Sequence, residues 1–135
     1  CIVVPRGHPL AARKTVRFEQ TLDYEHVSLP ISSALQVMLQ RAAALLGRTM
    51  IHRIIVSNFE AALGVVRAGL AIGVVSREVA DRQGASNGLR VISLADPWAV
   101  RKFVLCFRDE QGLSVAARLL SEYLGKRADA QDRDG

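Results

Sequence analysis

The sequence predicts an α/β domain built on a mostly parallel β-sheet with helices on both faces. Apolar runs that favour strands alternate with segments of helical periodicity, an order typical of parallel sheets. The run Ala71–Val75 contains no polar side chain, as expected for a central strand that is covered on both sides. The 135 residues, 50% of them hydrophobic, are enough for one domain with a buried core.

Prolines end the first two predicted strands. A buried strand over Ile2–Val4 stops at Pro5, and a weaker strand over Glu25–Leu29 stops at Pro30. Between them, Val16–Leu22 has the pattern of a single helical turn.

Serines and glycines mark the ends of two predicted helices. Ser32 or Ser33 is expected to cap a helix that Gly47 ends. After a strand over Met50–Val56, Ser57 and Glu60 fit an S-x-x-E capping box, and Gly69 ends the helix that it opens.

The remaining elements are shorter or lie near the end of the chain. Residues 83–88 (QGASNG) are predicted to be a loop, and residues 126–135 a flexible tail. The predicted elements are a helix over Arg77–Arg82, strands over Leu89–Leu94 and Phe103–Phe107, and a final helix over Gly112–Leu124.

Composition and motif searches narrow the classes of function. The net charge of +5 permits contact with nucleic acid, but the basic residues are scattered and are not interleaved with aromatic ones. Cys1 and Cys106 lie in apolar runs and are expected to be reduced core thiols. No apolar run reaches the length of a membrane span. No phosphate-binding glycine motif, nucleophile elbow or metal-ligand spacing is present, so we expect no enzyme, metal or cofactor.

Two predicted helix starts remain as candidate binding features. Each follows a strand of a parallel sheet, where ligands bind beyond the carboxyl ends of the strands. Free amides and the positive end of the helix dipole at such places favour an anion. One start is at Ser32 and Ser33, and the other is at Ser57 and Asn58.

Four segments together resemble the LysR-type transcriptional regulators. They are CIVVPRGHPLA, FEQTLDYEHVSLPISSALQVML, VSNFEAALGVVRAGLAIGVVSREVA and LRVISLADPWAVRKFVLCFRDEQGLSVAARLLSEYL. Each is a weak motif, but their order and spacing over residues 1 to about 125 are fairly specific.

The resemblance implies a fold like that of a type 2 periplasmic binding protein, with two subdomains joined by two crossing strands. Ile2–Val4 and Phe103–Phe107 would be those strands, lying side by side, and residues 9–100 would be the second subdomain. Residues 101–125 would hold the second crossing strand and the last helix, which belongs to the first subdomain. Because the chain starts at Cys1 within a strand, we expect it to be a piece of a longer protein. The resemblance implies that the missing part includes a DNA-binding winged helix-turn-helix.

The resemblance also implies a site and a function. The effector-binding residues would be Ile31, Ser32, Ser33, Asn58 and Val75. The family commonly has a second glycine where this chain has Ala71 and a proline where it has Ser76, which puts that wall of the cleft in doubt.

The expected function is therefore sensing of a small anionic metabolite in a cytoplasmic, homo-oligomeric regulator that touches DNA only through its absent domain. Three alternatives stay open. They are a solute-binding module of a transport system, a fragment of a small α/β enzyme, and a nucleic-acid-binding domain with its basic residues on one face.

Overall fold

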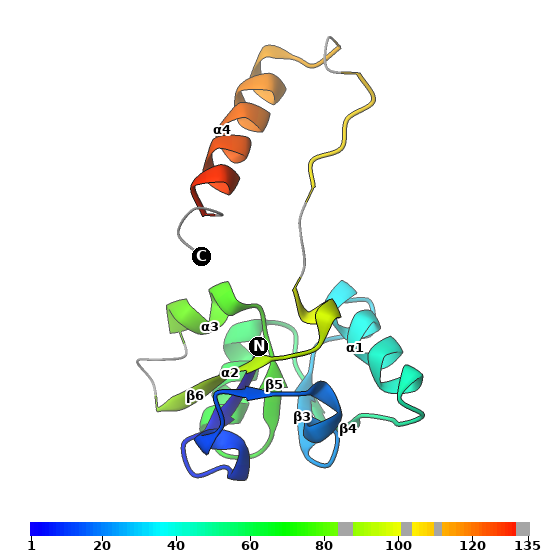
Figure 1. Ribbon diagram of the computed structural model, residues 1–135, viewed down its shortest axis with the longest axis vertical. Coiled ribbons are helices and arrows are strands. Elements are labelled where there is room, and N and C mark those ends of the chain that lie inside the picture. Colours follow the sequence, from blue (N-terminus) through cyan, green and yellow to red (C-terminus); the bar gives the residue numbers. More distant parts are fainter. Residues whose placement is uncertain (84–87, 101–103, 110–111, 132–135) are drawn as a thin grey trace. The chain divides into compact units, whose positions relative to one another are not determined.

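The computed structural model describes residues 1–83, 88–100, 104–109 and 112–131 (Figure 1). The chain divides into two compact units, Cys1–Val100 and Arg101–Gly135. The described part of the second unit contains the helix α4, Val115–Gln131. No helix among the described residues is long and apolar enough to cross a membrane.

The first unit contains a sheet with six strands among its described residues. The strands are β1 Ile2–Pro5, β2 Thr15–Val16, β3 Glu25–Ser28, β4 Ile51–Ile55, β5 Ile72–Val74 and β6 Leu89–Leu94. The helices and helical turns are η1 Pro9–Ala12, η2 Phe18–Thr21, α1 Ala34–Leu45, α2 Phe59–Arg67, α3 Arg77–Gln83 and η4 Pro97–Ala99.

The strand order is β2-β6-β1-β5-β3-β4. β3 is parallel to both β4 and β5, and β2 is parallel to β6. β1 is antiparallel to its two neighbours, β5 and β6, so the other five strands all run in one direction. The predicted mostly parallel sheet is confirmed.

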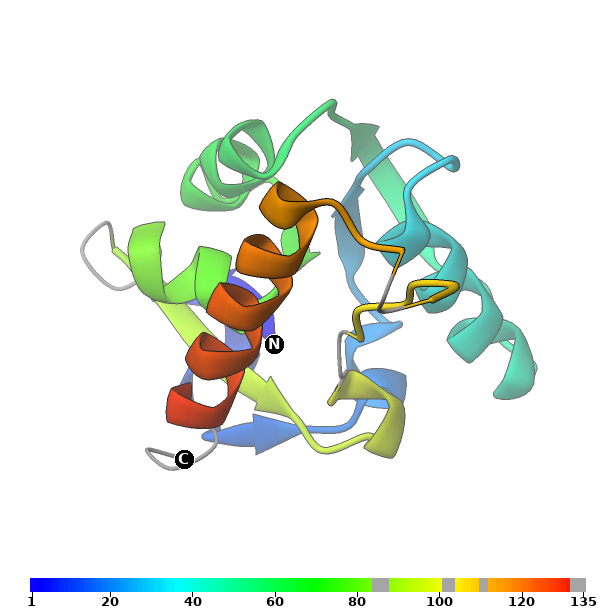
Figure 2. The same ribbon diagram turned by 90° about the horizontal axis from the view of Figure 1, so that it is seen from above.

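Helices cover both faces of this sheet. On one face α2 and α3 bury Leu63, Val66 and Ala80 against Val3 and Val27 of the strands. On the other face η1, η2 and α1 build two apolar clusters, which share Val74 and Leu94. Seen from above, α1 and α2 lie on opposite sides of β3 and β4 (Figure 2).

The two glycine stops act as predicted. Gly47 and Gly69 have φ angles of +66° and +73°, a left-handed conformation that glycine adopts without steric cost. After α2, the Gly69 amide donates to the carbonyl of Val66 and the Leu70 amide donates to that of Val65. These bonds satisfy the last carbonyls of the helix.

The predicted strand over Phe103–Phe107 is wrong. Phe103 lies outside the described residues, and residues 104–107 belong to no strand. An apolar run becomes a strand only where a neighbour accepts its backbone hydrogen bonds. β1, its expected partner, already has β5 on one side and β6 on the other.

Two smaller differences concern β2 and α4. Thr15–Val16 forms the short strand β2, which the sequence pattern was too brief to predict. α4 continues past Gly125 to Gln131, because one glycine in a helix costs only about 1 kcal/mol and the residues after it are mostly good helix formers.

Candidate functional site

Three neighbouring strands end at the same edge of the sheet, which we call the carboxyl edge. Ser28 of β3 pairs with Ile55 of β4, and the Val56 amide donates to the Ser28 carbonyl over 2.9 Å. β5 runs parallel to β3 on its other side. The segments that follow these strands lead into α1, α2 and α3, so all three helices start at this edge.

The segments that follow the three strands lead to different faces of the sheet. The chain leaves β3 for the face covered by α1, whereas it leaves β4 and β5 for the face covered by α2 and α3. Helices that diverge from neighbouring strands leave a crevice between their starts, which is where open parallel sheets bind ligands. The start of α1 and the start of α2 flank this position on opposite faces (Figure 2).

Ser33 is the N-cap of α1, but its side chain does not cap the helix. Its backbone is extended and its hydroxyl accepts no hydrogen bond from the first turn. The backbone alone makes the turn, because the Ser33 amide donates to the Pro30 carbonyl over 2.8 Å. The prediction that Ser32 or Ser33 stands at the cap position is confirmed for Ser33, but no side-chain cap forms, so the Ser33 hydroxyl and the first amides of α1 are not used by one.

Asn58, not Ser57, is the N-cap of α2. Its Oδ1 accepts a hydrogen bond from the Ala61 amide over 2.9 Å. The predicted Ser57–Glu60 capping box is wrong, because α2 begins at Phe59 and the third residue of the helix is Ala61. Asn58 Oδ1 is used inside the helix and Asn58 Nδ2 donates to Ser57 Oγ over 3.4 Å, so the second hydrogen of Nδ2 is what remains for a ligand.

The other predicted site residues differ in exposure. Ile31 is 71% exposed and precedes the α1 turn at the carboxyl edge. Val75, directly after β5, is 2% exposed, and its side chain belongs to the core beneath α2. Its amide and carbonyl are bonded to Cys1, so Val75 offers little to a ligand.

Two polar features of this region were missed from the sequence. Ser28 Oγ and His52 Nδ1 form a hydrogen bond of 2.6 Å between β3 and β4. Gln36, in the first turn of α1, is 3% exposed and its Nε2 has no partner among the described residues. No spacing in the sequence shows the Ser28–His52 bond, because it depends on strand register. The burial of Gln36 was not predicted, because a polar side chain in a helix is ordinarily expected at the surface.

The carboxyl edge thus offers hydrogen-bond donors and one helix end without a side-chain cap. This chemistry suits an anionic or polar ligand. Among the described residues, no group of three or more His, Cys, Asp or Glu side chains could hold a metal ion.

Comparison with protein-family models matches residues 1–129 to the LysR substrate binding domain. Comparison with curated protein sequences gave no match.

Solved structures with the same fold include three regulators. A putative LysR family regulator from Pseudomonas aeruginosa has a TM-score of 0.74 and 18% identity, over 94% of this chain and 45% of that one. The regulatory domain of Synechocystis PCC6803 CcmR in complex with 2-PG has a TM-score of 0.71 and 19% identity, over 91% and 59%. The effector-binding domain of QuiR in complex with shikimate has a TM-score of 0.62 and 21% identity, over 71% and 44%. The chain spans about half the length of these structures.

Proposed function

This chain belongs to the LysR substrate-binding domain family, and on that premise we propose that it senses a small anionic metabolite at the carboxyl edge. The family forms the effector-binding part of transcriptional regulators. Binding would occur in a cleft between residues 9–100, which form the second subdomain, and the first subdomain. The observation that carries the proposal is the start of α1, where the Ser33 hydroxyl does not cap the helix.

The chemistry of that helix start favours an anion. The positive end of a helix dipole stabilises a nearby negative charge by about 0.3–1 kcal/mol, and by more where the site is partly buried. A hydrogen bond from the hydroxyl of Ser32 or Ser33 would add about 0.5–1.5 kcal/mol net. The relatives with shikimate and 2-PG are examples of regulators that bind small molecules.

Control of transcription would follow from a shift in the populations of two arrangements of the subdomains. An effector that binds one arrangement of the subdomains ten times more tightly than the other shifts the equilibrium between them by about 1.4 kcal/mol. We propose that DNA is contacted only through the family's helix-turn-helix domain, that the protein works in the cytoplasm, and that this chain has no catalytic role. The alternative of a transport solute-binding module gains no support from the comparisons, since the family model and the relatives named above are regulators.

Exposed apolar side chains support a homo-oligomer. β4 is an edge strand whose Ile51, Ile54 and Ile55 are 41–66% exposed. On the preceding helix α1, Val37 and Leu45 are 52% and 81% exposed. Where exposed apolar side chains form one contiguous patch, that patch commonly marks a protein–protein contact.

The test is substitution of the two serines in the full-length regulator. We expect Ser33→Ala to weaken the effector response by about 2–10-fold, with Ser32→Ala weakening it less or equally, because a hydrogen bond of 0.5–1.5 kcal/mol is lost. DNA binding without effector should stay unchanged in both variants. The matched control is Ser93→Ala, since Ser93 of β6 accepts from Arg77 Nη2 and takes no part in the start of α1.

Effector titrations followed by DNA binding give the measurement. A panel of small carboxylates and phosphates, with shikimate among them, serves to find the ligand by thermal shift. Unchanged titration curves for both Ser32→Ala and Ser33→Ala would refute the assignment of the site.

A further inference from the structure

One polar side chain is buried in the first turn of α1. Gln36 is 3% exposed, and its Nε2 has no hydrogen-bond partner among the described residues. The other buried residues of α1 are Leu39, Ala42 and Ala43, which pack in an apolar cluster with Phe18. The buried side of this helix is therefore apolar except in its first turn, which lies at the carboxyl edge.

Gln36 and Ser33 belong to the same turn of the helix. Ser33 is the N-cap of α1, and Gln36 is the third residue of the helix. Side chains three positions apart on a helix are neighbours, and a helical side chain leans back toward the N-terminus. A glutamine at this position often accepts from the N-cap amide, but the Ser33 amide donates to the Pro30 carbonyl instead. The Gln36 amide is therefore directed toward the helix start without being used by a cap.

The unpaired amide of Gln36 destabilises the chain when no ligand is bound. A buried donor without a partner has lost its hydrogen bonds to water and gained none in return. A leucine in its place would pack without this cost. The terminal amide of a glutamine can turn by 180°, which exchanges Nε2 and Oε1 within the same space. An acceptor that reaches the helix start can thus receive a hydrogen bond from Nε2 without any movement of α1.

The donors at this helix start are all neutral. Residues 29–36 contain no charged side chain, so this segment offers hydroxyls, backbone amides and the Gln36 amide. A carboxylate has one negative charge and two oxygens in a plane, which suits two neutral donors side by side. A phosphate group has close to two negative charges at pH 7 and is commonly bound by Arg or Lys. This wall of the site therefore favours a carboxylate over a phosphate.

We propose that Gln36 is a specificity-determining residue of the site at the start of α1. Its Nε2 donates to one oxygen of a ligand carboxylate, and the Ser33 hydroxyl donates to the other. The inference rests on the function proposed above and names the class of its ligand, a carboxylate and not a phosphate.

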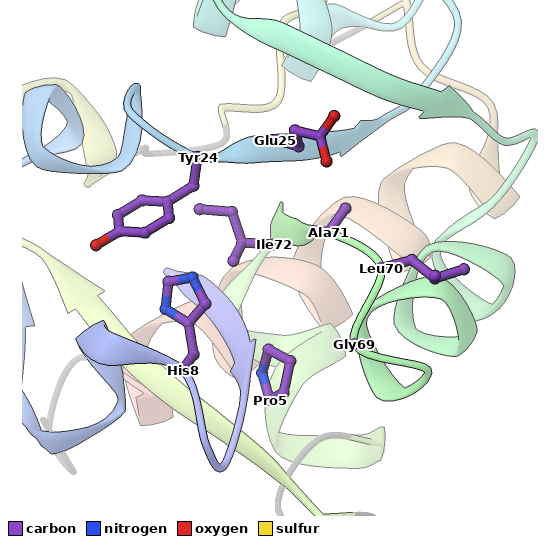
Figure 3. Close-up of a pocket in the computed structure, with 8 residues that line it drawn as sticks. All are labelled: Pro5, His8, Tyr24, Glu25, Gly69, Leu70, Ala71 and Ile72. Carbon is purple, nitrogen blue, oxygen red and sulfur yellow. The ribbon is translucent and has the colours of Figure 1, made fainter.

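A pocket at the opposite edge of the sheet serves as an internal comparison. β1 is antiparallel to β5, so its last residue, Pro5, meets the starts of β3 and β5 at this amino edge. The pocket has a volume of about 170 Å³, and its lining includes Tyr24, Glu25 and Gly69 (Figure 3). Among the described residues that line it there is a carboxylate but no Lys or Arg, so we expect no anion to bind there.

The first experiment follows the side-chain amide of Gln36 directly. Acetate and inorganic phosphate are titrated separately into the ¹⁵N-labelled 135-residue chain at pH 7 and constant ionic strength. We expect acetate to shift the side-chain NH₂ signals of Gln36 and the backbone amides at the start of α1, and to bind several times more tightly than phosphate. The half-buried Gln40, one turn further along α1, is the matched control, and its side-chain signals should not move.

The outcomes separate this inference from the proposed function. Shifts of the first α1 amides without any shift of the Gln36 side chain would overturn the role of Gln36 and leave the anion site in place. Tighter binding of phosphate than of acetate would overturn the carboxylate class alone. Shifts confined to residues 69–72, or none at the start of α1, would overturn both the inference and the site.

The second experiment uses a substitution with two opposite effects. Gln36→Leu removes the unpaired donor, so the urea midpoint of the ligand-free chain should rise. The same change should weaken acetate about 2–10-fold, because one hydrogen bond is lost. Gln40→Leu is the control and should leave the affinity for acetate unchanged. A lower urea midpoint together with unchanged acetate affinity in Gln36→Leu would show that Gln36 only packs in the core.

Discussion

Lowering the pH should destabilise the fold through His26. This residue of β3 is fully buried, with its ring 6.5 Å from that of Phe18, and neither of its ring nitrogens has a hydrogen-bond partner among the described residues. Burial lowers the pKa of His26 from 6.5 to about 4; the backbone of Tyr24 opposes this, and the charge of His52 adds to it. The folded protein therefore holds His26 neutral where the unfolded chain would protonate it.

The size and sign of the effect follow from that difference in pKa. Above pH 6.5 the His26 ring is neutral in both the folded and the unfolded state, so it does not change the free energy of unfolding with pH. Below pH 6.5 the unfolded chain takes up the proton first, so the free energy of unfolding falls by 1.36 kcal/mol per pH unit. Between 6.5 and about 4 the loss reaches roughly 3 kcal/mol, and about 2 kcal/mol of it is present at pH 5.

Urea unfolding of the wild type and His26→Leu at pH 7, 6 and 5, followed by circular dichroism, measures this loss. The variant keeps an apolar side chain in the site and cannot be protonated, so its stability should fall by about 2 kcal/mol less than that of the wild type between pH 7 and pH 5. His8→Asn is the control. Burial also lowers the pKa of His8, but His8 is less buried than His26, so this substitution should reduce the loss of stability by less. If His26→Leu loses as much stability as the wild type over this range, buried His26 is not the cause.

Two further substitutions test the core and the start of α2. Gly73→Ala should destabilise the fold by about 1–3 kcal/mol, because the new Cβ would lie 3.1 Å from Val27 Cγ1 and 3.3 Å from Val66 Cγ2; an unchanged urea midpoint would show that these side chains move aside freely. Asn58→Ala should cost about 0.5–2 kcal/mol of stability through loss of the α2 cap, whereas Ser57→Ala should cost little. The reverse order of these two variants in thermal unfolding would restore the capping box that the sequence predicts.

The sequence predicted that α1 and α2 start beyond the ends of neighbouring parallel strands, which the structure confirms, but it did not predict how each helix start is capped. Strand, helix and glycine stop follow one another so regularly that the starts of α1 and α2 had to lie beyond the ends of parallel strands. Ser33 stands at the predicted cap position of α1 but does not cap through its hydroxyl, and Asn58 rather than Ser57 caps α2. A shift of one residue in the start of α2 replaces Ser57 by Asn58, and sequence patterns seldom fix a helix boundary to one residue.

The sequence by itself determined the α/β class, the direction of most strands and the ends of α1 and α2 at Gly47 and Gly69. These features depend on residues within a few positions of one another, where spacing and backbone freedom act directly. Only the tertiary structure decided which strands are neighbours, since each edge of a strand can pair once and β1 has both edges occupied. The same long-range pairing brings Ser28 to His52 and joins Pro5, Tyr24 and Gly69 around one pocket. No local pattern contains such contacts, because they depend on which distant segments compete successfully for the same hydrogen bonds and apolar surface.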